Sequence, residues 1–170
     1  TTTQSLDWHD ANSPHSFAYD NHVLLQLVHS TIEDVSLKEG LPYETVAGAL
    51  ERRIEAGVNW TEMADIERLG LDEIALKKGQ GNYVTLVTGQ FREGEIVILG
   101  VLAGHEKAVV VDFLRSIPQR ILQGVQAVCC DLWEAYTEAV REEIPTARIV
   151  ADRFHVARHY REAADDLRKQ

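Results

Sequence analysis

Two aspartates stand where the folded chain would present carboxylates at the end of a sheet. Asp72 lies in an apolar run between Leu71 and Ile74, at a point where a buried strand prefers an apolar side chain. Asp131 directly follows the apolar run AVCC and so stands at the carboxyl end of a buried strand. Ligands of open α/β sheets gather beyond the carboxyl ends of strands. The sequence therefore predicts that the two carboxylates converge.

Two carboxylates a few ångströms apart repel, and the pKa of each rises unless a cation neutralises them. Mg²⁺ or Mn²⁺ suits such a pair, because these hard ions accept a few protein carboxylates and keep water or phosphate as their other ligands. Two such ions about 4 Å apart assist phosphodiester displacement. We predict Asp72 and Asp131 as metal ligands and catalytic residues. Asp131 also suits an N-cap of the helix that follows it, whereas the sequence suggests no structural role for Asp72.

Other polar residues near the carboxyl end of the chain are weaker candidates. Asp152 follows an apolar run and either caps the last helix or joins the site. His155 and His159 are one helical turn apart, but no third ligand stands at a recognisable spacing, so we predict no metal there. Three acids are expected on the solvated face of the same helix: Glu162, Asp165 and Asp166.

The elements that must position the aspartates begin near residue 63. Apolar patterns predict strands over 69–77, 82–88, 95–102, 125–130 and 148–151, and helices over 105–120, 132–143 and from 154 onward. Three strands with short links form an antiparallel meander, and strands reached through helices are parallel. This order is typical of a ribonuclease-H-like mixed α/β sheet, in which the first and fourth strands are neighbours.

Residues 1–62 show helical spacing instead and are predicted as a separate all-α region ahead of a catalytic core at 63–170. Ser30 and Glu33 have the spacing of a capping box, and Gly40 suits a helix end. Two short helices around such a turn are typical of a helix-turn-helix, with ordinary three-helix packing as the alternative. If the region reads DNA, its third helix presents outward Tyr43, Thr45 and Arg52.

Charge and composition limit the functional classes. The 170 residues include 17 basic and 27 acidic side chains, a net charge of −10, which lacks the basic footprint of a nucleic-acid binder and predicts weak DNA binding by this chain. No apolar run approaches the ~20 residues of a membrane span. Cys129 and Cys130 are adjacent in a strand pattern, so a disulfide framework is not expected and a reducing cytoplasm fits. The chain lacks an initiator Met and stops within a helical pattern, so we expect truncation at both ends.

Over nearly its whole length the chain resembles bacterial insertion-sequence transposases of the ISL-three type, members of the DDE superfamily. The resemblance is carried, in order, by SLKEGLPYETV, GLDEIALKKGQGNYVTLVTG, FLRSIPQR, AVCCDLWEAYTEAV and IVADRFHVARHYREAADDLRK. It implies a ribonuclease-H-like core in which two Asp and one Glu hold Mg²⁺ to cut and join DNA. Asp72 and Asp131 match the first two acids, and the third would follow residue 170. KKGQGNY departs from the more usual KKGH followed by an aromatic residue.

We therefore expect a fragment of a DNA transposase whose parent acts as a homo-oligomer on the double-stranded ends of its element. With two of three acids, the chain alone is expected to be inactive. A non-catalytic DNA-binding or regulatory remnant acting through residues 14–56 is the alternative. A third possibility is an unrelated ribonuclease-H-like nuclease whose site is completed by Asp152 or Asp166.

Overall fold

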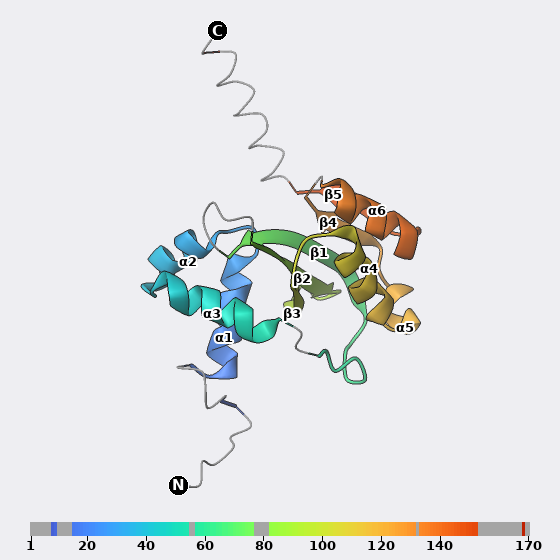
Figure 1. Ribbon diagram of the computed structural model, residues 1–170. Coiled ribbons are helices and arrows are strands. Elements are labelled where there is room, and N and C mark those ends of the chain that lie inside the picture. Colours follow the sequence, from blue (N-terminus) through green and yellow to red (C-terminus); the bar gives the residue numbers. More distant parts are fainter. Residues whose placement is uncertain are drawn as a thin grey trace.

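Figure 1 shows the computed structural model of the chain. The structure describes residues 8–9, 15–54, 57–76, 82–131, 133–152 and 168. None of the described helices is long and apolar enough to cross a membrane. The helix predicted from residue 154, with His155, His159, Glu162, Asp165 and Asp166, lies outside the described residues.

Helices and strands follow the predicted order. The helices are α1 Phe17–Leu27, α2 Ile32–Glu39, α3 Tyr43–Arg53, α4 Lys107–Ser116, α5 Gln119–Leu122 and α6 Glu134–Glu143. The strands are β1 Ile66–Ala75, β2 Tyr83–Phe91, β3 Ile96–Leu102, β4 Ala127–Cys130 and β5 Arg148–Ala151.

The five strands form one mixed sheet in the order β3-β2-β1-β4-β5. β1, β2 and β3 pair antiparallel, whereas β4 pairs parallel with both β1 and β5. The predicted neighbourhood of the first and fourth strands is therefore confirmed.

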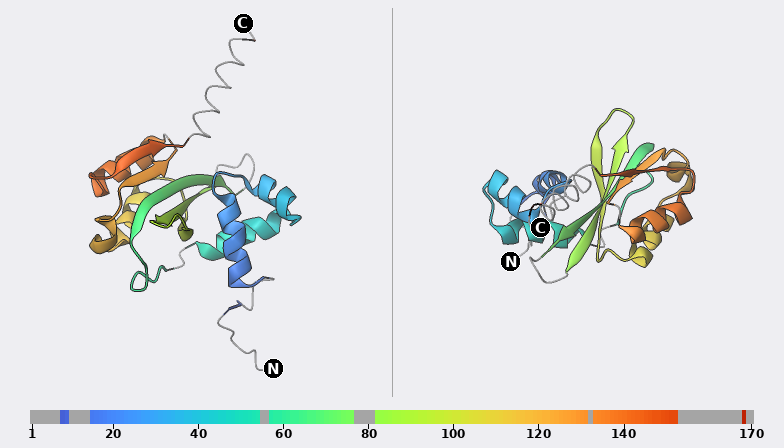
Figure 2. Two further views of the ribbon diagram at one scale, coloured as in Figure 1. Left: turned by 180° about the vertical axis from the view of Figure 1, so that it is seen from behind. Right: turned by 90° about the horizontal axis from the view of Figure 1, so that it is seen from above.

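Helices cover both faces of this sheet (Figure 2, right). On one face, α4, α5 and α6 enclose a continuous apolar core that includes Leu71, Val87, Leu114 and Tyr136. We refer to this side as the α4–α6 face. Burying this much apolar surface is the main force that fixes the strands in place.

The opposite side is the α1–α3 face, and its helices also pack directly on the sheet. Leu24 and Leu50 of these helices share one buried cluster with Ile74, Leu86 and Val101 of the strands. The helical region and the sheet are thus in apolar contact, and a domain boundary near residue 62 stays a prediction.

Several predicted element ends move for local reasons. The N-cap of α2 is Thr31, whose hydroxyl accepts from the backbone N–H of Asp34, so the box predicted at Ser30 lies one residue further on. Gly40 ends α2 in the left-handed region, as predicted. The helix predicted over 105–120 is divided at Pro118, because proline has no N–H to continue the helical ladder.

Candidate active site

Strand register brings the two predicted aspartates to neighbouring positions, where the pairing of β1 with β4 ends. Leu71 of β1 pairs with Cys130 of β4 in parallel register. The next residue on each strand is an aspartate, Asp72 or Asp131, and both are half-buried. Adjacent strands lie about 4.8 Å apart, so the two residues occupy neighbouring positions at one edge of the sheet.

β5 adds a third carboxylate to the same row. Cys130 pairs with Ala151, and the backbone N–H of Asp152 donates to the carbonyl of Cys130 at 3.1 Å. Asp152, which the sequence left between a cap and the site, thus follows the third parallel strand at the level of Asp131. We call this row of Asp72, Asp131 and Asp152 the acidic edge.

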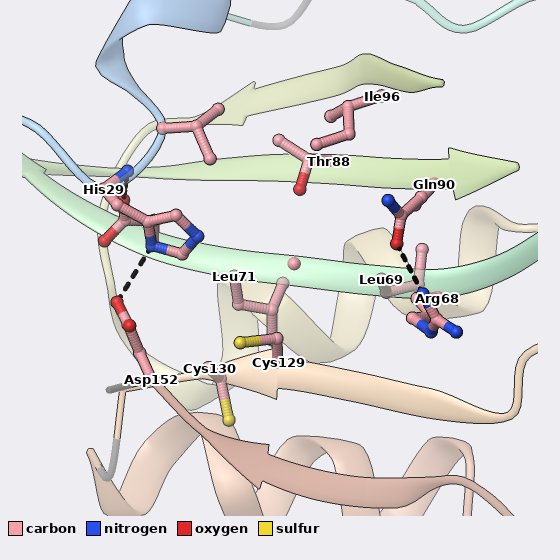
Figure 3. A pocket seen from close by; sticks show the side chains of 13 residues that line it. His29, Arg68, Leu69, Leu71, Thr88, Gln90, Ile96, Cys129, Cys130 and Asp152 are labelled. Carbon is pink, nitrogen blue, oxygen red and sulfur yellow. Dashed lines mark hydrogen bonds and ion pairs between the residues drawn. The ribbon is translucent and has the colours of Figure 1, made fainter. Parts of the chain in front are cut away.

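His29, in the turn between α1 and α2, links two members of the acidic edge. Its backbone N–H donates to Asp72 Oδ2 at 2.9 Å, and its ring Nδ1 lies 2.9 Å from Asp152 Oδ2 (Figure 3). His29 has a φ of 58°, a left-handed conformation that is uncommon for a residue with a side chain. The sequence suggested no structural role for Asp72, and that expectation is wrong, because its carboxylate anchors the α1–α2 turn.

A pocket of about 220 Å³ opens beside these groups on the α1–α3 face. His29, Asp72 and Asp152 line one end of it, and the Arg68 guanidinium donates to Gln90 Oε1 at 3.0 Å at the other end (Figure 3). The pocket thus runs along the sheet from the acidic edge to a cation.

Glycine at position 70 keeps the middle of this pocket open. Gly70 pairs with Thr88 of β2 and with Cys129 of β4. A Cβ atom at position 70 would lie 2.3 Å from Thr88 Oγ1, closer than two such atoms can approach. A side chain at this position would therefore displace Thr88 and fill the floor of the pocket.

Asp131 is not the N-cap of the next helix, contrary to the sequence interpretation. α6 starts at Glu134, and its N-cap is Trp133, whose side chain makes no capping hydrogen bond. Asp131 directly follows β4 and stands two residues before this N-cap. A capping role therefore does not account for its position.

Neighbouring groups near the acidic edge are held in their neutral forms. Burial raises the pKa of the Cys130 thiol to about 11, and burial together with the charges of Asp152 and Asp72 raises the pKa of Cys129. Burial also raises the pKa of Tyr136, although a hydrogen bond with Thr85 opposes the shift. Both thiols are protonated at neutral pH, which disfavours thiolate chemistry here.

The predicted DNA-reading residues are engaged within the chain. Tyr43 donates its hydroxyl hydrogen to the carbonyl of Leu76 at 2.9 Å, and the Arg52 guanidinium donates to both carboxylate oxygens of Asp20 at 2.9 and 3.0 Å. Asp20 is buried, and a buried carboxylate requires a charged partner. Tyr43, Thr45 and Arg52 are all half-buried, and DNA reading by these residues stays a prediction.

The donor chemistry of the acidic edge fits a hard divalent cation, since Mg²⁺ and Mn²⁺ prefer carboxylate oxygens. Within the described ranges, no three His, Cys, Asp or Glu side chains are already arranged as a metal cage. The assignment of Asp72 and Asp131 as metal ligands therefore stays a prediction.

A family model described as "Transposase", of the ISL-three type of DDE enzymes, matches residues 69–170 and so includes both aspartates. The chain is 31% identical over 140 residues to the transposase for insertion sequence element IS1001 of Bordetella parapertussis, covering 82% of this chain and 34% of that protein. It is 27% identical over 171 residues to the transposase for IS1557 of Mycobacterium tuberculosis, covering 99% of this chain and 37% of that protein. The chain spans about a third of the length of these relatives. By this match, the chain belongs to the ISL-three type of transposase.

Proposed function

We propose that this chain carries part of the nuclease core of a DNA transposase, with Asp72 and Asp131 as two of its metal ligands. The observation that carries the proposal is the parallel pairing of Leu71 with Cys130, because Asp72 and Asp131 are the residues that follow this pair. Family membership supports the same assignment, because the matched segment contains both residues.

The sheet supports a ribonuclease-H-like fold for this core. An antiparallel meander of β1, β2 and β3 is followed by β4, which pairs in parallel with β1, and by β5, which pairs in parallel with β4. α4, α5 and α6 pack on one face of these strands, and this packing gives the acidic edge a rigid support.

Carboxylates of Asp72 and Asp131 would hold Mg²⁺ or Mn²⁺, which assists displacement at a phosphodiester by activating the attacking oxygen and stabilising the leaving one. The chain itself orients Asp72 through the backbone N–H of His29. A third acid, a Glu downstream of residue 170, is expected from the family. We accordingly propose that the longer protein cuts element ends and joins them to a DNA target as a homo-oligomer.

A non-catalytic DNA-binding remnant has less support. Tyr43 and Arg52, which such a role would need at the surface, already bind Leu76 and Asp20. DNA binding through the third helix stays a prediction, in which Thr45 retains a half-exposed position.

Cleavage by the longer protein tests the proposal directly. We expect Mg²⁺-dependent nicking at the ends of its element, with Asp72→Asn and Asp131→Asn each removing it. The matched control is Asp65→Asn, an exposed aspartate just before β1 at the other end of the strand. Cleavage that survives Asp72→Asn would overturn the assignment.

The 170-residue chain gives a second result on a supercoiled plasmid with Mn²⁺. Because it carries two of the three expected acids, we predict no turnover. Turnover that Asp72→Asn abolishes would contradict the claim that a downstream acid is needed.

A further inference from the structure

Three ring side chains stack beside the acidic edge. The rings of Tyr83 and His105 have centroids 5.0 Å apart at an interplanar angle of 17°, and those of His105 and Trp133 are 5.7 Å apart at 13°. Tyr83 begins β2, His105 follows β3, and Trp133 precedes α6. Near-parallel rings from three separate elements therefore form one stack, with His105 in the middle.

Hydrogen bonds fix the central ring of this stack. His105 Nδ1 lies 2.5 Å from Glu73 Oε2, and the backbone N–H of His105 donates to Glu106 Oε2 at 3.1 Å. Tyr83 pairs with Ala75 at the end of β1, so its backbone is held by the sheet. The stack is preorganised, and a ligand that adds to it meets a ring face already in place.

Trp133 closes the stack on the solvent side. Its side chain is 49% exposed although it is the largest ring of the three. One face of the indole contacts His105. The indole is thus half-exposed beside the stack, and a planar aromatic ligand suits such a ring best.

The indole of Trp133 lies close in sequence to a member of the acidic edge. Trp133 is two residues from Asp131, a span of at most ~7 Å between Cα atoms. Glu73, which holds the middle ring, directly follows Asp72 in β1, and its side chain points to the opposite face of the sheet. A nucleotide whose phosphate lies at the acidic edge would thus bring an adjacent base within reach of the indole.

The local charge selects a base over a phosphate. Trp133 lies between Asp131 and the exposed Glu134, and Glu73 stands behind His105, so a phosphate bound directly to this surface would be repelled. A base inside a duplex has both faces covered by its neighbours, so only an unpaired base exposes one to an aromatic side chain.

Resting on the proposed function, we propose that Trp133 is a stacking site for an unpaired nucleobase next to the phosphate that the transposase cuts. Recognition is by ring stacking and is therefore tolerant of sequence. Trp133 would position the strand, while Asp72 and Asp131 act on the phosphate.

The test compares two short single-stranded oligonucleotides that differ at one position, 2-aminopurine in one and an abasic residue in the other. Both carry the same phosphates, so the ratio of their affinities for the 170-residue chain reports base contact alone. We expect the base to improve binding by about fivefold to a hundredfold, the range for stacking of one base on an aromatic ring, and its emission to be quenched.

Trp133→Ala should remove this ratio, whereas Trp133→Phe should keep most of it and controls for folding. Trp8→Ala is the matched control, because Trp8 is 61% exposed and lies outside the stack. A ratio that persists in Trp133→Ala, or that is close to one in the wild-type chain, would overturn the proposal.

Metal dependence separates this inference from the proposed function. The base-to-abasic ratio should be the same with and without Mn²⁺ and should survive Asp72→Asn. If the ratio is present but Mn²⁺ does not bind the acidic edge, the metal assignment fails alone. If Mn²⁺ binds there and the ratio is absent, the stacking site fails alone.

Discussion

The two faces of the sheet differ in how completely they are covered. Where α4, α5 and α6 pack on the sheet, side chains of both layers are fully buried, among them Leu114, Val128 and Tyr136. The α1–α3 face is packed only at one end, near Ile74 and Leu86, and its other part forms the pocket over Gly70.

The α4–α6 face therefore supplies most of the packing, whereas the polar groups of the pocket lie on the α1–α3 face. Alternate residues of one strand serve the two tasks, because side chains along a strand point to opposite faces. Leu71 packs under the α4–α6 helices while its neighbour Asp72 belongs to the acidic edge, and Cys130 and Cys129 are divided in the same way. The α4–α6 face can thus hold the acidic edge in place while the pocket on the α1–α3 face stays open.

Truncation of an apolar side chain on each face should give the largest contrast. Leu114→Ala removes a fully buried side chain from the α4–α6 core, and we expect it to lower the free energy of unfolding by about 2–5 kcal/mol. Ile96→Ala, at a 40% exposed position beside the pocket, should cost under ~1 kcal/mol. Urea unfolding followed by circular dichroism measures both, and equal losses would contradict the difference between the faces.

Alkaline pH should weaken the packed face. Because the folded pKa of Cys130 is about 11 against 9.0 unfolded, the unfolded chain loses its thiol proton first, and the free energy of unfolding falls as pH rises from 9 to 11. At about 1.4 kcal/mol per pKa unit, the loss is on the order of 2–3 kcal/mol, with a further decrease from Tyr136 at higher pH.

Denaturant unfolding at a series of pH values measures this loss. Cys130→Ala should reduce the slope between pH 9 and 11, while Cys129→Ala should change it less, since Cys129 is less buried than Cys130. A wild-type stability that is flat across this interval would rule out the burial argument.

The Asp20–Arg52 pair should support the helices of the α1–α3 face. Asp20→Ala leaves the Arg52 guanidinium without its carboxylate, and we expect a loss of about 1–3 kcal/mol, less than for a fully buried pair because Arg52 is 25% exposed. The exposed Lys107–Glu138 pair serves as the comparison, and Glu138→Ala should leave thermal unfolding unchanged. Similar melting temperatures for the two variants would contradict the structural role of Asp20.

Much of the sheet could be predicted because its strands are short apolar runs with clear limits. The strand at 148–151 was predicted with its observed bounds, and the neighbourhood of β1 and β4 followed from the order of elements. The same order predicted that Asp72 and Asp131 belong to neighbouring strands, whereas the register that places Leu71 opposite Cys130 comes from the structure alone.

Contacts between distant segments could not be predicted in this way. His29 meets Asp72 across 43 positions and Asp152 across 123, and no local pattern encodes such a meeting. Arg52 was assigned to the surface because one helix alone does not reveal that Asp20 is buried opposite it. The ring stack at Trp133 likewise needs three elements to be assembled before it exists.

Binding of Mn²⁺ to the 170-residue chain, followed by electron paramagnetic resonance, tests the central claim most directly. We predict saturable binding that Asp72→Asn and Asp131→Asn each weaken by about tenfold or more, equal to ~1.4 kcal/mol or more, while Asp65→Asn leaves it unchanged. Binding that both acidic-edge variants retain at wild-type affinity would contradict the account.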